Sequence, residues 1–100
     1  MVYMQLLVNV YMDKGENVMT KSIFTENYAL FLKLLVASRK HAGLTQKEIA
    51  DKLHKNQSYV SKYENGERRL DVIEFADVAN AIGVDPLKIM QELLKGWKNN

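Results

Sequence analysis

The feature that most constrains this chain is a pair of short helical patterns separated by only four residues, between Thr45 and Gly66. The first begins with TQKE at Thr45, in which threonine and glutamate can each accept a hydrogen bond from the other's backbone amide. The second begins after Asn56 and ends at Asn65. Two helices joined by so tight a turn must cross at a steep angle, which requires a small residue where they approach. Ala50 stands at that point, so the pattern predicts two short, crossed helices with a shared apolar seam.

Start and stop signals divide the rest of the chain, from Thr25 onward, into three more helices. The residues predicted to cap their amino ends are Thr25, Asp71 and Asp85. The residues predicted to end them are Gly43, Gly83 and Gly96. Five short helices with no strand between them predict an all-α fold.

Apolar residues recur in each pattern at three- and four-residue spacing, as in helices with one buried face. The predicted core is Phe31, Leu34, Leu35, Ser38, Ile49, Ala50, Leu53, Val60, Tyr63, Phe75, Val78, Ala79, Ile82, Leu87, Met90, Leu93 and Leu94. Together with Trp97, the last helix carries five large apolar side chains, which is more than one face can bury. We therefore expect part of this helix to form a dimer surface.

The predicted organisation is an extension over 1–22, one domain over 23–97 and a tail over 98–100. Residues 2–12 are rich in β-branched and aromatic residues, which favours a strand. Two interpretations stay open. The extension is an edge strand that pairs with its copy in a dimer, or the natural protein starts at Met19, since residues 14–16 can be encoded by a purine run that resembles a ribosome-binding site.

The chain lacks the residues that several classes of function require. The chain has no cysteine, and His41 and His54 have no clustered partner ligand, so we expect no metal or other cofactor. No nucleophile or glycine-rich phosphate loop accompanies the carboxylates, which argues against an enzyme. The apolar runs are too short for a membrane span and the amino-terminal segment is a poor signal peptide, so we expect a cytoplasmic protein without a membrane partner.

The outward face of the helix predicted over 57–64 carries amide, hydroxyl and ammonium groups: Gln57, Ser58, Ser61 and Lys62. These groups suit the major groove of DNA, where glutamine pairs with adenine and lysine reaches guanine. The net charge argues little, because 14 lysines and arginines face 12 acids. The positive residues around this face do suit phosphate contacts: Lys40, Lys47, Lys52, Lys55, Arg68 and Arg69.

Over about residues 28–94 the chain resembles the phage-repressor and Cro-like helix-turn-helix proteins, also called the xenobiotic-response-element (XRE) type. The segments that carry the resemblance are Arg39, Gly43-Leu44-Thr45-Gln46, Ile49-Ala50, QSYVSKYENG at 57–66 and Ile82-Gly83-Val84. The resemblance implies a compact five-helix, lambda-repressor-like DNA-binding domain with its motif at about 45–66. One departure is His54, which stands where the family usually has a glycine in the turn and must accept a left-handed backbone.

The resemblance also implies roles for particular residues. The residues expected to contact bases are Gln57, Ser58, Tyr59 and Lys62. The backbone contacts expected from the resemblance and from charge are Gln46, Lys47, Lys55, Asn56, Ser61, Asn65, Arg68 and Arg69. Arg39 and Glu64 match a partly buried ion pair. Two simpler interpretations remain: Tyr59 packs on the preceding helix, and Arg68-Arg69 is a solvated loop.

These patterns predict a repressor that binds a pseudo-palindromic site on double-stranded DNA as a homodimer. A restriction-modification controller or other activator would use the same site and present acids such as Asp71, Glu74 and Asp77 to polymerase. An antitoxin or other protein-interaction module would instead bind a toxin through the last helix or the amino-terminal segment. In that case Gln57→Ala and Lys62→Ala would leave function intact, whereas changes at Leu93 or Trp97 would abolish it.

Overall fold

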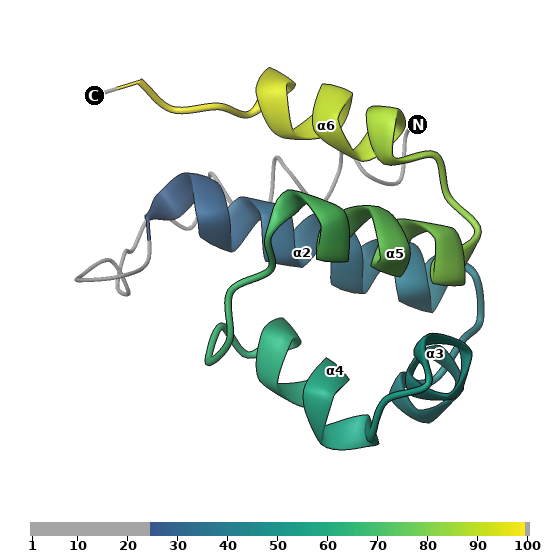
Figure 1. Ribbon diagram of the computed structural model, residues 1–100. Coiled ribbons are helices and arrows are strands. Elements are labelled where there is room, and N and C mark those ends of the chain that lie inside the picture. The colour runs from purple at the N-terminus through teal and green to yellow at the C-terminus, as the bar shows by residue number, and fades with distance from the viewer. Residues whose placement is uncertain (1–24, 100) are drawn as a thin grey trace.

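The computed structural model describes residues 25–99, and these form five α-helices without a strand (Figure 1). The helices are α2 (Glu26–His41), α3 (Gln46–Leu53), α4 (Gln57–Glu64), α5 (Val72–Ile82) and α6 (Pro86–Lys95). The predicted all-α fold is therefore confirmed for this part of the chain. The predicted strand at 2–12 and the hypothesis of a start at Met19 lie outside the described residues.

The predicted caps begin the helices where the sequence placed them. Thr45 and Asp71 each form a complete capping box with the glutamate three residues later. Asp85 accepts a hydrogen bond from the Leu87 amide at the start of α6. Asn56 precedes α4 as expected, but its side chain makes no capping hydrogen bond. Local signals thus set the helix boundaries, and at α4 they do so without the asparagine side chain.

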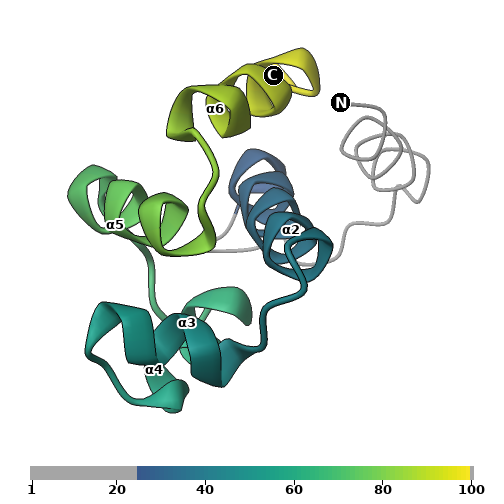
Figure 2. The same cartoon turned by 90° about the vertical axis from the view of Figure 1, so that its right-hand side faces the viewer.

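Helix α2 is the centre of the domain. Figure 2 shows α6 above it, α5 beside it, and α3 and α4 below, and α2 packs against α4, α5 and α6. Its side chains Leu30, Leu34 and Leu35 are almost fully buried, as are Ile49 of α3 and Val60 of α4. Because most of the circumference of α2 is covered, the other helices are positioned by their contacts with one shared helix.

The predicted buried stripe of α6 is confirmed at Leu93 and wrong at Leu87, Met90 and Leu94. The residues that α6 buries are Ile89, Glu92 and Leu93. The large apolar residues that it leaves exposed are Leu87, Met90, Leu94 and, just beyond its end, Trp97. Two apolar stripes lie side by side on this helix, and both have helical spacing. Ile89 and Leu93 are four residues apart on one face, whereas Leu87, Met90 and Leu94 follow a spacing of three and four on a neighbouring face. The spacing alone therefore does not decide which stripe is buried. The expected surplus of apolar surface on this helix is present.

The chain stays attached to the domain beyond the boundary predicted at residue 97. The Lys98 amide donates to Asn27 Oδ1 at 2.9 Å, and Asn27 Nδ2 donates to the Lys98 carbonyl at 3.1 Å. The Lys98 ammonium also lies 3.4 Å from a Glu26 carboxylate oxygen. These contacts hold the end of α6 against the first turn of α2.

The turn between α3 and α4 contains the strained backbone that the sequence predicted. His54 adopts φ 59° and ψ 43°, the left-handed region, and its amide closes the end of α3. A side chain in this region costs about 1–2 kcal/mol because Cβ approaches the following carbonyl.

Replacing this residue should stabilise the protein. We expect His54→Gly to raise the free energy of unfolding by about 0.5–1 kcal/mol, because the relief of strain exceeds the added chain entropy of glycine. Urea denaturation monitored by circular dichroism measures the change. The matched control is Lys52→Gly, at an exposed helical position in the same helix, which should destabilise by about 1 kcal/mol. A destabilised His54→Gly variant would contradict the strain argument.

Candidate nucleic-acid interface

Helices α3 and α4 form the crossed pair that the turn predicted. Ile49 and Ala50 of α3 and Val60 and Tyr63 of α4 are each no more than 1% exposed. Burial of these side chains turns the opposite face of α4 outward. The polar residues exposed on it include Gln57, Ser58 and Lys62, and Ser61 is half-buried.

A buried ion pair joins this unit to α2. Arg39 Nε lies 2.7 Å from Glu64 Oε2, and the Arg39 Nη2 group donates to Glu64 Oε1 at 3.1 Å. The two side chains are only 11% and 7% exposed. Arg39 Nη1 also donates to the Leu44 carbonyl at 2.9 Å, which fixes the chain just before α3. The ion pair expected from the sequence is therefore present, and it is bidentate.

Gln46 extends this ion pair to the exposed face of α4. Its Nε2 donates to Glu64 Oε1 at 2.9 Å, and its Oε1 accepts from Gln57 Nε2 at 3.3 Å. Gln46 and Gln57 are the first residues of α3 and α4, so the crossing of the helices brings them together. The sequence predicted both as DNA contacts but not as partners, since two glutamines 11 residues apart carry no periodic signal.

Three more of the predicted backbone contacts, Lys47, Asn56 and Asn65, lie near the ends of these helices. Lys47 is exposed and pairs with Asp51 at 3.2 Å within α3. Asn56 and Asn65 are exposed at the two ends of α4. All of these side chains are exposed to solvent.

The Tyr59 side chain packs against three neighbouring side chains. Its ring meets the Tyr63 ring edge-on at 5.7 Å. The ammonium of Lys55 lies 5.2 Å from the Tyr59 ring centroid, and the guanidinium carbon of Arg68 lies 4.9 Å from it. Burial raises the pKa of Tyr59, and Glu74 adds to that shift. The phenol is therefore neutral and carries its proton.

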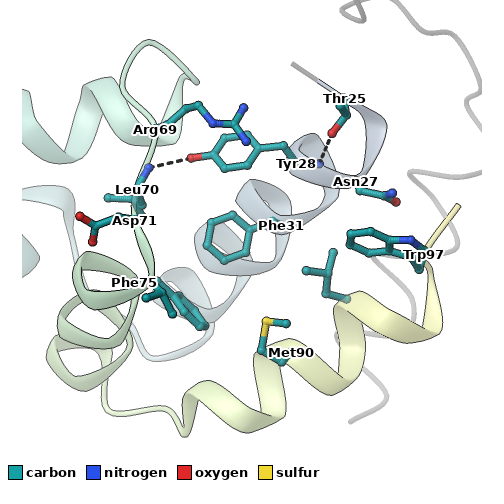
Figure 3. A pocket seen from close by; sticks show the side chains of 12 residues that line it. Thr25, Asn27, Tyr28, Phe31, Arg69, Leu70, Asp71, Phe75, Met90 and Trp97 are labelled. Atoms are coloured by element: carbon teal, nitrogen blue, oxygen red, sulfur yellow. Dashed lines mark hydrogen bonds between the residues drawn. The ribbon is translucent and has the colours of Figure 1, made fainter. Parts of the chain in front are cut away.

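Arg68 and Arg69 follow α4, and both contact other parts of the domain. Arg68 forms a bidentate ion pair with Glu74 of α5, with the shorter contact at 2.7 Å. The guanidinium carbon of Arg69 lies 4.1 Å from the Tyr28 ring centroid. The Tyr28 hydroxyl in turn accepts a hydrogen bond from the Leu70 amide at 3.1 Å, as Figure 3 shows. The interpretation of this pair as a merely solvated loop does not fit these contacts.

Glu74 has two roles in the structure. Its carboxylate accepts from the Asp71 amide at 2.9 Å to complete the capping box of α5, and it also binds Arg68. The hydrogen bond from Arg68, followed by that from Asp71, lowers the pKa of Glu74 to about 2. The carboxylate is consequently charged throughout the physiological pH range.

Residues 25–99 contain no group of three or more histidines, aspartates or glutamates arranged to hold a metal ion. Within the same residues no helix has both the length and the apolar character needed to cross a bilayer.

The crossed pair α3–α4, with a buried seam and an exposed polar face, defines a helix-turn-helix domain. A helix-turn-helix family model matches residues 35–89. A solved structure of an XRE-family like protein from Pseudomonas syringae pv. tomato str. DC3000 is 51% identical, with a TM-score of 0.67, over 69% of this chain and 84% of that chain. The comparison with curated proteins found no match. The chain belongs to the XRE-type helix-turn-helix family of DNA-binding transcription regulators.

The buried ion pair should be strongly coupled. We expect Arg39→Met and Glu64→Gln each to lower the free energy of unfolding by about 3 kcal/mol, because each leaves the other group buried without its partner. The double variant should lose less than the sum. Urea denaturation of the four proteins measures this cycle. The exposed pair Lys47–Asp51 is the control, and alanine at either position should cost less than about 1 kcal/mol. Strictly additive losses for Arg39 and Glu64 would contradict the coupling.

Proposed function

We propose that the protein is a transcriptional repressor that binds a pseudo-palindromic operator as a dimer, with α4 in the major groove. The observation that carries this proposal is the exposed face of α4, where Gln57, Ser58 and Lys62 point to solvent with no exposed carboxylate among them. The one acid of the helix, Glu64, is paired with Arg39 and only 7% exposed. Such a protein acts at the nucleoid, in the cytoplasm.

The chemistry of this face matches base edges. A glutamine amide can pair bidentately with adenine, lysine can reach guanine, and serine can donate or accept. The contact with Gln46 supports this use of Gln57, because a restrained amide loses less side-chain entropy when it binds. We assign the backbone-contacting role to the polar and basic groups around it, namely Gln46, Lys47, Lys55, Asn56, Ser61, Asn65 and Arg69.

The dimer is proposed from the uncovered side of α6. Leu87 and Leu94 are 68% and 59% exposed, and Met90 lies between them on the same face. Beside this stripe an apolar pocket of about 300 Å³ opens between α2, α5 and α6, with Met90 and Trp97 at its edge (Figure 3). We assign this surface to a second copy, because an operator with two half-sites needs two recognition helices held in fixed relation.

The contacts made by the acidic residues at the start of α5 favour repression over activation. An activating patch would need exposed, uncommitted carboxylates. Of the three acids named for such a patch, Asp71 and Glu74 are instead used in the capping box and Glu74 also binds Arg68, which leaves Asp77 as the exposed carboxylate outside these contacts. Occupying a promoter requires nothing beyond DNA binding.

Substitutions on α4 should remove sequence discrimination and keep general affinity for DNA. We expect the wild type to bind DNA from upstream of its gene about a thousandfold more tightly than a randomised duplex pool. Gln57→Ala/Lys62→Ala should narrow that ratio by about a hundredfold and leave salt-sensitive binding to both DNAs. Fluorescence anisotropy at two salt concentrations measures the affinities.

The matched control is Lys33→Ala/Asn80→Ala, which removes an ammonium group and a side-chain amide from exposed positions on α2 and α5. This control should keep the wild-type ratio between the affinities for the upstream DNA and the randomised pool. If the α4 variant kept the ratio instead, α4 would not be the helix that contacts bases, and the alternative of a protein-interaction module would be favoured.

Substitution on the exposed stripe of α6 should dissociate the dimer. We expect Leu94→Glu to raise the dimer dissociation constant at least about tenfold, because a buried charge would have to be desolvated at the interface. Sedimentation equilibrium measures this constant. The control Asn80→Glu adds the same charge at an exposed position on α5, outside the apolar stripe, and should have little effect. Equal behaviour of the two variants would remove α6 from the interface.

A further inference from the structure

Arg68 lies at the junction between α4 and α5, where the sequence predicted a contact with DNA phosphate. Its Nη1 and Nη2 groups donate to the two carboxylate oxygens of Glu74 at 3.2 and 2.7 Å, and Nη1 also donates to the Arg69 carbonyl at 3.2 Å. Two parallel hydrogen bonds to one carboxylate are the strongest and most directional arrangement available to arginine. A phosphate would have to displace this carboxylate to receive the same donors.

The same guanidinium restrains Tyr59, a residue predicted to contact DNA. Arg68 and Lys55 both lie within cation–π range of the Tyr59 ring, at 4.9 and 5.2 Å from its centroid. The buried Tyr63 ring meets Tyr59 edge-on. Three neighbours from α4, the preceding turn and the following loop therefore set the orientation of this ring.

Glu74 is itself held in place by secondary structure. It is the third residue of α5, and its carboxylate completes the capping box with Asp71. The side chain is 27% exposed, and that of Arg68 is 40% exposed. The orientation of Tyr59 on α4 is thus tied through Arg68 to the amino end of α5, a helix that carries none of the predicted base contacts.

We propose that Arg68 and Glu74 are positioning residues for DNA recognition, which hold the Tyr59 ring against the DNA, and that Arg68 is not a phosphate contact. This inference rests on the proposed function, in which α4 contacts bases. Tyr59 then supplies discrimination through its ring and hydroxyl at a sugar or a thymine methyl group, and loss of either partner in the ion pair weakens specific binding alone.

The test measures specific and general binding separately. The probes are a duplex selected by the wild-type protein from a randomised pool and a scrambled duplex of the same composition. We expect Arg68→Gln to weaken binding to the selected duplex about fivefold, to leave the scrambled duplex within about twofold, and to keep the slope of log K against log salt. If both duplexes weakened equally and the slope fell by about 0.9, Arg68 would be a phosphate contact and the inference would be overturned.

The variant Glu74→Gln distinguishes positioning of the Tyr59 ring from competition between Glu74 and DNA phosphate for Arg68. Glutamine can keep the capping box, so α5 is retained while the charge of the ion pair is lost. We expect the same selective loss on the selected duplex as for Arg68→Gln. If Glu74→Gln tightened binding to both duplexes, the carboxylate would merely have kept Arg68 from phosphate, and the inference would fail.

Two controls complete the design. Asp77→Asn removes an exposed carboxylate one turn further along α5 and should leave the ratio between the two duplexes unchanged. In a Tyr59→Ala background, Arg68→Gln should cause no further loss of that ratio, because its effect acts through the ring. A further loss of the same size would overturn the inference. A wild type that bound both duplexes equally would overturn the proposed function itself, a result separate from any behaviour of the variants.

Discussion

Two opposite charges buried between α2 and α4 depend on each other, because an isolated charge in a protein interior is costly. Arg39 and Glu64 meet this cost with two mutual hydrogen bonds, and Leu44 and Gln46 satisfy further donors and acceptors. The pair joins the central helix to α4, to Leu44 two residues before α3, and to Gln46, the first residue of α3. The geometry of the helix-turn-helix unit relative to the core thus depends on one hydrogen-bonded polar cluster surrounded by apolar packing.

The exposed face of α4 is linked to the rest of the domain at both ends. Near its start, Gln57 is bound by Gln46, which is itself bound to Glu64. Further along, Tyr59 lies beside Arg68, which is bound to Glu74 of α5. A surface that must present several donors in one geometry gains from such restraints, since side chains ordered before binding lose less entropy on binding. The short α4 is consequently positioned by α2, α3 and α5 together.

The opposite side of the domain has a different character. Helix α6 buries Ile89 and Leu93 against α2 but leaves Leu87 and Leu94 in solvent. Contiguous apolar surface of this kind is uncommon on a monomer and marks an interaction site. In the proposed function, polar recognition by α4 and apolar association through α6 are carried by separate helices, so that variants of each can be studied independently.

The sequence by itself determined the helix boundaries and the capping box at Thr45, because these depend on residues within a few positions of each other. Through the family resemblance it also predicted the left-handed backbone at His54 and the pairing of Arg39 with Glu64. Only the tertiary structure decided that α6 turns Ile89 inward and Leu94 outward, that Gln46 bridges Glu64 and Gln57, and that Arg68 binds Glu74. These pairings join different helices or cross loops, so they follow from how the helices pack and have no periodic signature along the chain.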